Sequence, residues 1–159
     1  MSKDIIPNSG DTPYLSASRA NNAVSSHISY DTKYLDVGNC VFIGGKTFVV
    51  TYQEKDFYSN DSHNLILYFK DKSKRTRLNQ LFFVACVEKS LKHKYSWGDS
   101  ISNAKIQSDT LKLPTKDDGE IDYEFMSDFI SAVQKLVIKD VVLWADKRII
   151  VTKEAITQI

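Results

Sequence analysis

Residues 109–130, with the sequence DTLKLPTKDDGEIDYEFMSDFI, contain the clearest local pattern in the chain. Leu111 and Leu113 alternate with polar residues, as the inward-facing positions of a short strand do. Pro114 would end that strand, because proline has no N–H group for a ladder hydrogen bond. Asp117-Asp118-Gly119 is typical of a turn. The stretch therefore predicts a short strand, a tight turn and the beginning of a helix.

From Ile121 onward the apolar residues follow helical spacing. One stripe consists of Phe125, Phe129, Val133 and Leu136, and Met126, Ile130, Val137, Val141 and Trp144 widen it. A helix that covers only its own domain needs an apolar stripe roughly 100° wide. The pattern predicts a helix to about Trp144 that has a second packed surface, or else a domain that wraps more of the helix than usual. Residues 148–152 would then form a final strand or an irregular C-terminal tail.

Further elements are predicted upstream. In Asn39–Tyr52 two β-rich runs flank Gly44-Gly45, and this favours a tight hairpin closed by a two-residue Gly-Gly connection. His63–Lys70 predicts another strand, whereas the Ser- and Asn-rich stretch Ser16–Ser29 favours turns. Arg77–Lys92 changes to helical spacing. Its apolar face would consist of Leu78, Leu81, Phe82, Val84, Ala85 and Leu91.

The composition suits one folded domain with a substantial core, since the chain has 159 residues of which 42% are apolar. A net charge of +1 provides no global field that would attract nucleic acid. The charge is distributed unevenly, because Lys70–Lys94 contains eight Lys or Arg against only Asp71 and Glu88. This basic strip suits a local contact with phosphate, and it suits a solvated helix face equally well.

The two cysteines, Cys40 and Cys86, each lie in an apolar run, where Cys acts as a small buried hydrophobe. No Cys or His spacing indicates a zinc site. The first residues lack a signal-peptide core, and no apolar run reaches membrane-spanning length. We therefore expect a cytoplasmic protein in a reducing environment, with no membrane partner.

Catalytic motifs are weak. His27, His63 and His93 have no nucleophile or carboxylate at a recognisable motif spacing. Gly44-Gly45-Lys46-Thr47 is similar to the end of a phosphate-binding loop, but a β-rich run follows it instead of a helix. The acids between Asp117 and Glu124 complement the dipole of the following helix and lack the spacing of a calcium loop. The sequence predicts no enzyme, no metal site and no cofactor.

Several short motifs follow one another along the chain. They are Thr12-Pro13-Tyr14-Leu15-Ser16, Arg19-Ala20-Asn21-Asn22-Ala23, Gly38-Asn39-Cys40-Val41, Gly44-Gly45, His63-Asn64-Leu65-Ile66-Leu67, Tyr95-Ser96-Trp97-Gly98, Leu113-Pro114 and Gly119 to Met126. In this order they resemble the target recognition domain of type I restriction-modification specificity subunits, over roughly residues 11–150. Ala23 departs from the family pattern, which usually has glycine there, so the turn is expected to be shaped differently.

The resemblance implies a mixed α+β fold, with a curved, largely antiparallel β-sheet, flanking helices and a long C-terminal helix. It divides the chain into a flexible arm (residues 1–11), a recognition domain (12–120), and the start of a spacer helix with a tail (121–159). The usual subunit has two such domains, each followed by a long helix. The chain is thus expected to be half of a subunit, an excised domain or the recognition part of a larger enzyme.

The function implied by the resemblance is sequence-specific recognition of duplex DNA without catalysis. Base recognition needs hydrogen-bonding side chains on stiff loops, with phosphate contacts fixing the register. Arg19 suits guanine and Asn21 or Asn22 suits adenine, although a turn role accounts for the asparagines equally well. The candidate DNA-binding set is Ser16, Ser18, Arg19, Asn21, Asn22, Lys46, Lys74, Arg75, Arg77, Lys94, Tyr95 and Trp97. Core packing is the more frequent fate of a Tyr or Trp.

The implied partners are duplex DNA, a methyltransferase subunit and a restriction subunit. From the wide apolar stripe of the C-terminal helix we expect the chain to self-associate through this helix as a homodimer, or to bind the partner there. The candidate contacts on that helix are Ile130, Val137, Val141 and Trp144. A different hypothesis is a protein–protein adaptor that docks through this helix and binds no DNA. A hydrolase or transferase that uses the histidines is a third, which the missing motifs disfavour.

Overall fold

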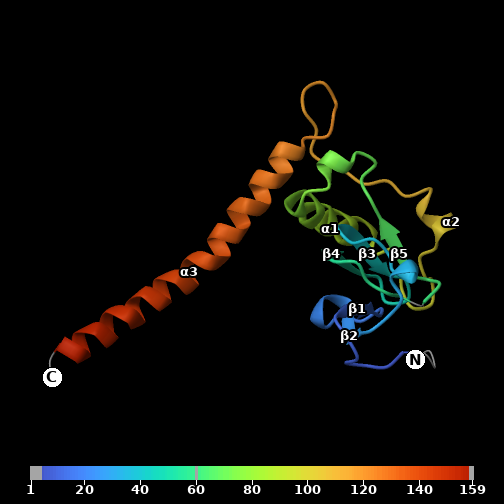
Figure 1. The fold of residues 1–159 in the computed structure, drawn as a ribbon. Coiled ribbons are helices and arrows are strands. Elements are labelled where there is room, and N and C mark those ends of the chain that lie inside the picture. Colours follow the sequence, from blue (N-terminus) through green and yellow to red (C-terminus); the bar gives the residue numbers. More distant parts are fainter. Residues whose placement is uncertain (1–4, 60, 158–159) are drawn as a thin grey trace.

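Figure 1 shows the computed structural model, which describes residues 5–59 and 61–157. The elements are β1 (Thr12–Leu15), η1 (Asn21–Ala23), β2 (Val24–Ile28), η2 (Thr32–Tyr34), β3 (Cys40–Gly44), β4 (Val49–Gln53), β5 (Leu65–Leu67), η3 (Lys72–Lys74), α1 (Arg77–Leu91), α2 (Asn103–Ile106) and α3 (Tyr123–Thr157). The strands pair antiparallel and a long helix follows them. The predicted α+β class with a long C-terminal helix is confirmed.

The strands form two small sheets. β1 and β2 pair with each other, and their register shifts between Tyr14 and Leu15. In the second sheet β3 lies between β4 and β5. An isolated bridge between Tyr14 and Tyr58 joins the first sheet to the segment after β4. There the Leu15 N–H donates to the Tyr58 carbonyl over 2.9 Å.

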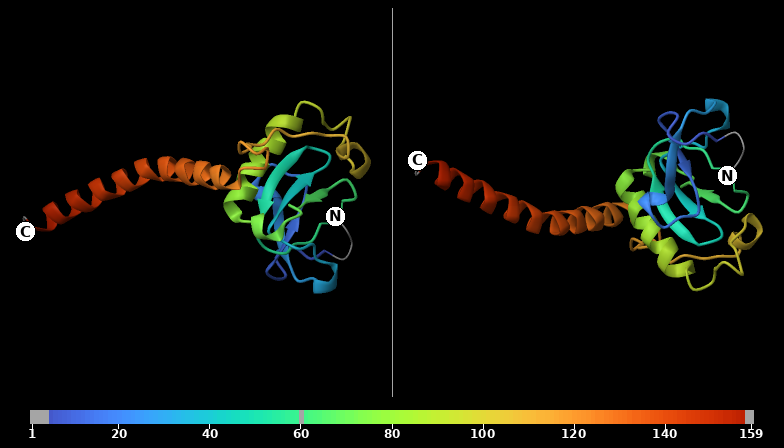
Figure 2. Two further views of the ribbon diagram at one scale, coloured as in Figure 1. Left: turned by 90° about the horizontal axis from the view of Figure 1, so that it is seen from above. Right: turned by 90° about the horizontal axis from the view of Figure 1, so that it is seen from below.

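β3 is buried on both faces, as the burial of all its residues shows. Successive strand residues point to opposite faces, so Val41 and Ile43 enter one hydrophobic cluster and Cys40 and Phe42 another. The first cluster contains Val41, Ile43, Phe48, Val50, Leu65, Val87, Leu91, Tyr95 and Ile101. The second contains Leu15, Ala23, Cys40, Phe42 and Phe57. Figure 2 shows α1 lying across the first face, between the strands and the start of α3.

The range of α1 agrees with the prediction, but its buried face does not. Ala85 is exposed, whereas Asn79 and Gln80 are buried. Gln80 Nε2 donates to the Asn39 carbonyl over 2.9 Å, whereas its Oε1 is buried without a partner among the described residues. Asn79 Oδ1 accepts from Ser127 Oγ over 2.8 Å. A search for apolar periodicity overlooks such residues, because hydrogen-bonded amides are buried at little cost.

The hairpin is present, but its predicted two-residue connection is wrong. Gly44 pairs with Val49 inside the ladder, and Gly45–Phe48 forms a four-residue turn. The positive φ of that turn falls on Phe48, at 49°, and not on a glycine. Glycine is required at position 45 because the His63 backbone lies close to it: a Cβ at Gly45 would lie 1.8 Å from the His63 carbonyl oxygen.

Residues 109–157 differ from the prediction in two places. Leu111 and Leu113 lie in no regular strand, although Leu111 packs against the first core cluster. Asp117–Gly119 does turn, with Gly119 at φ 87° and Thr115 bridged to Ile121. α3 then continues through residues 148–152, where a strand or tail was expected, to Thr157. No proline or glycine interrupts it after Gly119.

Other segments also differ from simple expectation. The Ser- and Asn-rich stretch contains β2 as well as turns. Of the N-terminal arm, residues 1–4 lie outside the described residues, while Ile5 is buried against Tyr14 and Ile28. α3 projects away from the domain (Figure 1), and none of the described helices combines the length and apolarity needed to cross a membrane.

Gly45 supplies a test of this packing. Gly45→Ala is expected to destabilise the protein by at least about 3 kcal/mol, because its Cβ would overlap the backbone of His63 and one of the two turns would have to move. Gly98→Ala is the matched control: nothing lies within 4 Å of that Cβ, so we expect a change within about 0.5 kcal/mol. Urea denaturation of both variants measures the two values. Equal stabilities would contradict the close approach at Gly45.

Candidate nucleic-acid interface

The turn between β1 and β2 has a strained backbone. Asn21, Asn22 and Ala23 have φ values of 48°, 52° and 67°, so three consecutive residues lie in the left-handed region. Asparagine tolerates this region better than most residues, whereas alanine does not. Ala23 is fully buried in the second core cluster, and the Ser16 N–H donates to its carbonyl over 2.9 Å. Packing thus holds a conformation that usually requires glycine.

Side-chain hydrogen bonds hold the same turn. Asn21 Nδ2 donates to the Val24 carbonyl over 3.0 Å, and Asn22 Nδ2 donates to the Tyr52 carbonyl over 2.9 Å. Ser18 Oγ accepts from the Ala20 N–H over 3.2 Å. Asn21 and Asn22 therefore have a turn role, and both remain exposed. Their contact with bases stays a prediction.

Arg19 joins this turn to the β3–β4 turn. Its Nη2 donates to the Thr47 carbonyl over 3.3 Å, and Thr47 Oγ1 donates to the Ala17 carbonyl over 2.6 Å. On the same turn, Lys46 Nζ lies 3.2 Å from Asp61 Oδ2. Asp61 was not among the predicted site residues, although its Asp-Ser-His order is typical of an Asx turn, and the His63 N–H donates to Asp61 Oδ1 over 3.0 Å. Arg19 and Lys46 thus lie on adjoining turns.

A groove follows the exposed side of α1. One hollow of about 370 Å³ is lined by Arg19, Asn22, Phe48, Val49, Val50, Thr51 and Glu88. A second, of about 390 Å³, shares Asn22, Val50 and Thr51 and is completed by Tyr52, Glu54, Arg77, Leu81 and Val84. A third, of about 620 Å³, shares Glu88 and adds Ala85, Lys89, Lys92 and His93. We call these three hollows the α1 groove.

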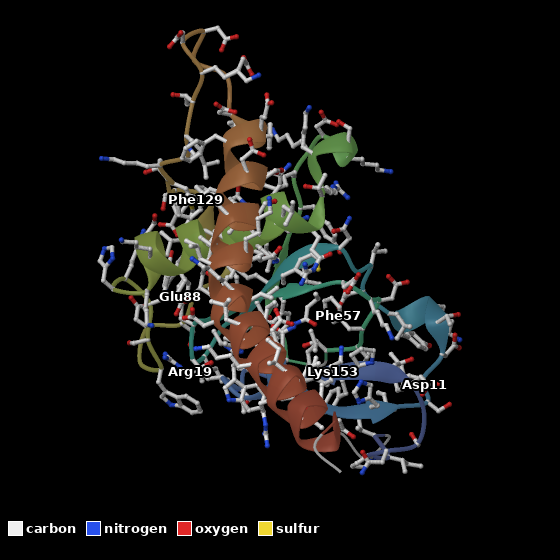
Figure 3. The ribbon with its side chains drawn as sticks, turned by 90° about the vertical axis from the view of Figure 1, so that its left-hand side faces the viewer. Asp11, Arg19, Phe57, Glu88, Phe129 and Lys153 are labelled. Carbon is white, nitrogen blue, oxygen red and sulfur yellow. The ribbon has the colours of Figure 1, made fainter. Side chains whose placement is uncertain are left out.

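The α1 groove contains part of the basic strip. Arg77, Lys89 and Lys92 line it, opposite Arg19 on the η1 side. Figure 3 shows Arg19 and Glu88 on the same side of α3. Glu88 was not among the predicted site residues, and Lys92 Nζ lies 2.9 Å from its Oε1. The groove is therefore mixed in sign with a basic excess.

The loop after α1 divides its predicted residues between core and surface. Tyr95 is buried, stacks on Phe48 at 5.5 Å between ring centroids, and donates to Asp109 Oδ2 over 2.5 Å. Lys94 also bonds Asp109. Burial raises the pKa of the Asp109 carboxyl, but hydrogen bonds from Lys94 and Tyr95 lower it, and the net pKa lies below the usual range. Trp97, by contrast, is 74% exposed.

Lys74 and Arg75 form a separate group at the start of α1. Arg75 Nε donates to the Phe69 carbonyl over 2.7 Å, and its guanidinium lies 4.9 Å from the Tyr68 ring centroid. Lys74 Nζ lies 5.6 Å from the ring centroid of Tyr123, in the first turn of α3. Lys74 thus contacts the start of α3, and Arg75 contacts the segment after β5. None of these contacts involves the Arg19 turn.

The helix residues predicted to meet a partner are mostly exposed. Val137, Val141 and Trp144 are 69%, 63% and 59% exposed, whereas Ile130 is half-buried. The Arg148 guanidinium lies 4.9 Å from the Trp144 ring centroid. Within residues 5–59 and 61–157, no group of three or more His, Cys, Asp or Glu side chains is placed to hold a metal ion.

Comparison with known proteins places this arrangement in a family. Residues 1–142 match the family described as "Type I restriction modification DNA specificity domain". The chain belongs to this family. It is also 28% identical, over 136 residues, to the type II restriction enzyme BgcI specificity subunit S.BcgI of Heyndrickxia coagulans. That match covers 81% of this chain and 37% of the relative, and no solved structure matches the chain.

Membership of the DNA specificity domain family confirms the resemblance drawn from the short motifs. The family is a non-catalytic recognition module of restriction-modification enzymes, so the prediction that the chain is not an enzyme agrees with it. The individual contact residues are a separate matter. Neither the family match nor the relative assigns a role to any one side chain, and the predicted DNA contacts therefore remain predictions.

Asp109 provides a test of the loop that supports Trp97. The lowered pKa means that Asp109 stabilises the fold above its unfolded pKa of about 3.9, and that this stability is lost as pH falls through the folded pKa. Asp109→Asn is expected to destabilise by about 1–2 kcal/mol at pH 7, with a smaller difference below about pH 4. Urea denaturation at both pH values measures this, and Asp140→Asn on exposed α3 is the control. A pH-independent difference would contradict the ion pair.

Proposed function

We propose that this chain recognises a short sequence in duplex DNA and directs a methyltransferase, and a nuclease that acts with it, to that site. The observation that carries the proposal is the placement of Arg19 and Asn22 on a braced turn beside the α1 groove, in a chain of the DNA specificity family. Base recognition requires donors and acceptors on stiff supports, and this turn provides them.

The two kinds of contact have different candidates. Arg19 and Asn22 are exposed hydrogen-bonding groups whose backbone is fixed, which suits contact with base edges. Lys46, Arg77, Lys89 and Lys92 lie around them as cations on the flanks, which suits phosphate. Phosphate contacts fix the register, and the braced turn then selects the bases.

A salt titration tests DNA binding directly. The wild-type chain is expected to bind duplex DNA, with log affinity falling against log salt by about 0.9 for each phosphate contact. Lys46→Ala should weaken all sequences alike and reduce that slope by about 1. Lys112→Ala, at an exposed lysine outside the basic strip, is the matched control and should change neither quantity. Arg19→Ala should instead reduce discrimination at one base position by about 1–3 kcal/mol.

These outcomes separate the hypotheses. If no duplex DNA is bound at low salt, with or without the methyltransferase subunit, the chain is the alternative protein–protein adaptor. The exposed apolar residues of α3 are the observation that supports that second function. If Arg19→Ala leaves the selected sequence unchanged in a folded protein, then Arg19 only braces the β3–β4 turn through Thr47.

α3 is proposed to pair with the methyltransferase subunit and with a second copy of itself. Its exposed apolar residues beyond the domain are Leu136, Val137, Ile138, Val141, Val142, Leu143, Trp144, Ile149 and Ile150. They surround most of the helix, which is typical of a helix covered on more than one side. A single partner helix would leave part of this surface in water.

The charges along α3 and the loop before it favour an antiparallel arrangement of two copies. Residues 117–128, which include that loop and the first turns of α3, contain six acids and no Lys or Arg, whereas residues 135–153 contain five Lys or Arg against two Asp. Antiparallel pairing places this acidic segment of each copy against the basic end of the other helix. A two-fold axis repeats every such contact, so each favourable charge pair occurs twice.

Sedimentation analysis tests the pairing. Wild type is expected to form dimers, and Lys147→Glu with Arg148→Glu should weaken them roughly tenfold at low salt through the loss of repeated charge pairs. Adding Glu124→Lys and Asp128→Lys should restore the affinity. Val137→Glu tests the apolar part and should abolish pairing, while circular dichroism checks folding. A wild type that stays monomeric at high concentration, with Val137→Glu binding the methyltransferase normally, would refute this role of α3.

A further inference from the structure

The most exposed large apolar side chain described is Trp97, at 74%. It stands at the tip of a tight turn in which Ser96 and Asp99 exchange backbone hydrogen bonds of 3.1 and 3.2 Å. Nothing lies within 4 Å of a Cβ built on the next residue, Gly98, so the tip is open on that side as well. The indole is thus presented to solvent by the backbone.

The turn that presents Trp97 is braced on both sides. Before it, Tyr95 is buried, stacks on Phe48 and bonds Asp109. After it, Lys105 Nζ bonds the Asp99 carboxylate and donates to the Ser100 carbonyl over 2.9 Å. An indole on a fixed support loses little conformational entropy when it is covered, and it contributes a large contact area.

The surroundings of Trp97 connect it to the proposed DNA-binding side. Phe48, on which Tyr95 stacks, follows Thr47, and the Thr47 carbonyl accepts from Arg19. His93, which precedes Lys94 and Tyr95, lines the basic end of the α1 groove. These contacts run from Arg19 through the β3–β4 turn to the Trp97 turn, and none of them involves α3.

We propose that Trp97 stacks on a DNA base, as a rigid aromatic contact that adds affinity without charge. The proposal rests on the proposed DNA-binding function and names a further mode of contact within it. Every base offers an aromatic face, so such a contact is tolerant of sequence, unlike that of Arg19. An indole inserted at a base step also holds the duplex unstacked there. Trp97 would then help a partner enzyme reach a base that lies inside the stack.

Stacking has a different signature from phosphate binding. Loss of a base–aromatic contact weakens binding roughly 5- to 100-fold. It releases no counterions, so the salt slope of the affinity stays unchanged. Lys46→Ala should therefore change the salt slope of the affinity, whereas Trp97→Ala should lower the affinity and leave its salt slope unchanged. Trp97 is exposed, so its replacement leaves the core intact.

The experiment uses duplexes selected from a random pool by the wild-type chain. The chain has two Trp residues, so the signal of Trp97 is the fluorescence of wild type minus that of Trp97→Ala, which keeps Trp144. This signal is expected to be quenched as the duplex binds. Trp97→Ala should bind the same duplex 5- to 100-fold more weakly with the same salt slope. Trp97→Phe should recover most of the affinity.

Each other outcome overturns the proposal in a defined way. Unchanged fluorescence at saturating DNA, or wild-type affinity in Trp97→Ala, would show that the indole stays in water. A fluorescence change on adding the methyltransferase subunit without DNA would assign Trp97 to a protein interface. If the pool yields no bound duplex at all, the proposed DNA-binding function itself fails, and with it this inference.

Discussion

The burial of β3 on both faces is the constraint on which the rest of the structure depends. α1 covers the side of Val41 and Ile43, while Ala23 of η1 packs on the side of Cys40 and Phe42. β4 lies at the edge of its sheet, and the Asn22 amide donates to the Tyr52 carbonyl of that strand. Gln53 Nε2 returns a hydrogen bond to the Asn22 carbonyl over 2.8 Å. The strained turn therefore covers part of an open strand edge, which would otherwise expose unpaired backbone groups. The α1 groove is the space left between this turn and α1.

Local patterns predicted the elements that local physics determines. The ranges of α1 and the beginning of α3 followed from helical spacing, and the β3–β4 hairpin followed from β-rich runs around glycines. The errors came from tertiary contacts. Gly45 is needed because the His63 backbone passes close to it, and buried Asn79 and Gln80 form hydrogen bonds with Ser127 and with the Asn39 carbonyl. Leu111 packs against the first core cluster from a segment that lies in no regular strand. None of these partners is adjacent in sequence, so no periodicity reveals them.

The candidate site was predicted by residue type, and its geometry was not. The short motifs identified the β1–β2 turn, but only the structure shows that Ala23 adopts a left-handed φ of 67° in a fully buried position. Tyr95 and Trp97 have similar sequence surroundings, but Tyr95 is buried and Trp97 is exposed. Tyr95 contacts Asp109 and Phe48, whereas Trp97 lies at the tip of an open turn. Lys74 and Arg75 belong to the same basic strip as Arg77, yet their contacts lead to Tyr123 and Phe69. A run of basic residues in a sequence therefore indicates an anionic partner, but only the fold shows which of those residues share one surface.

The basic surface and the exposed apolar surface lie on different parts of the molecule. Basic residues line the α1 groove, whereas the segment that leads into α3 is acidic, so a polyanion is attracted to the groove and repelled from that segment. Beyond the domain, α3 exposes apolar side chains such as Leu136, Val137 and Trp144. An isolated helix gains little stability from its own hydrogen bonds, and most helical stability in proteins comes from packing. Each large apolar side chain that a partner covers contributes up to roughly 1.5–3 kcal/mol. In the proposed assembly, burial of these side chains by a partner would stabilise the projecting part of α3. Binding to that assembly would then fix where the α1 groove meets DNA.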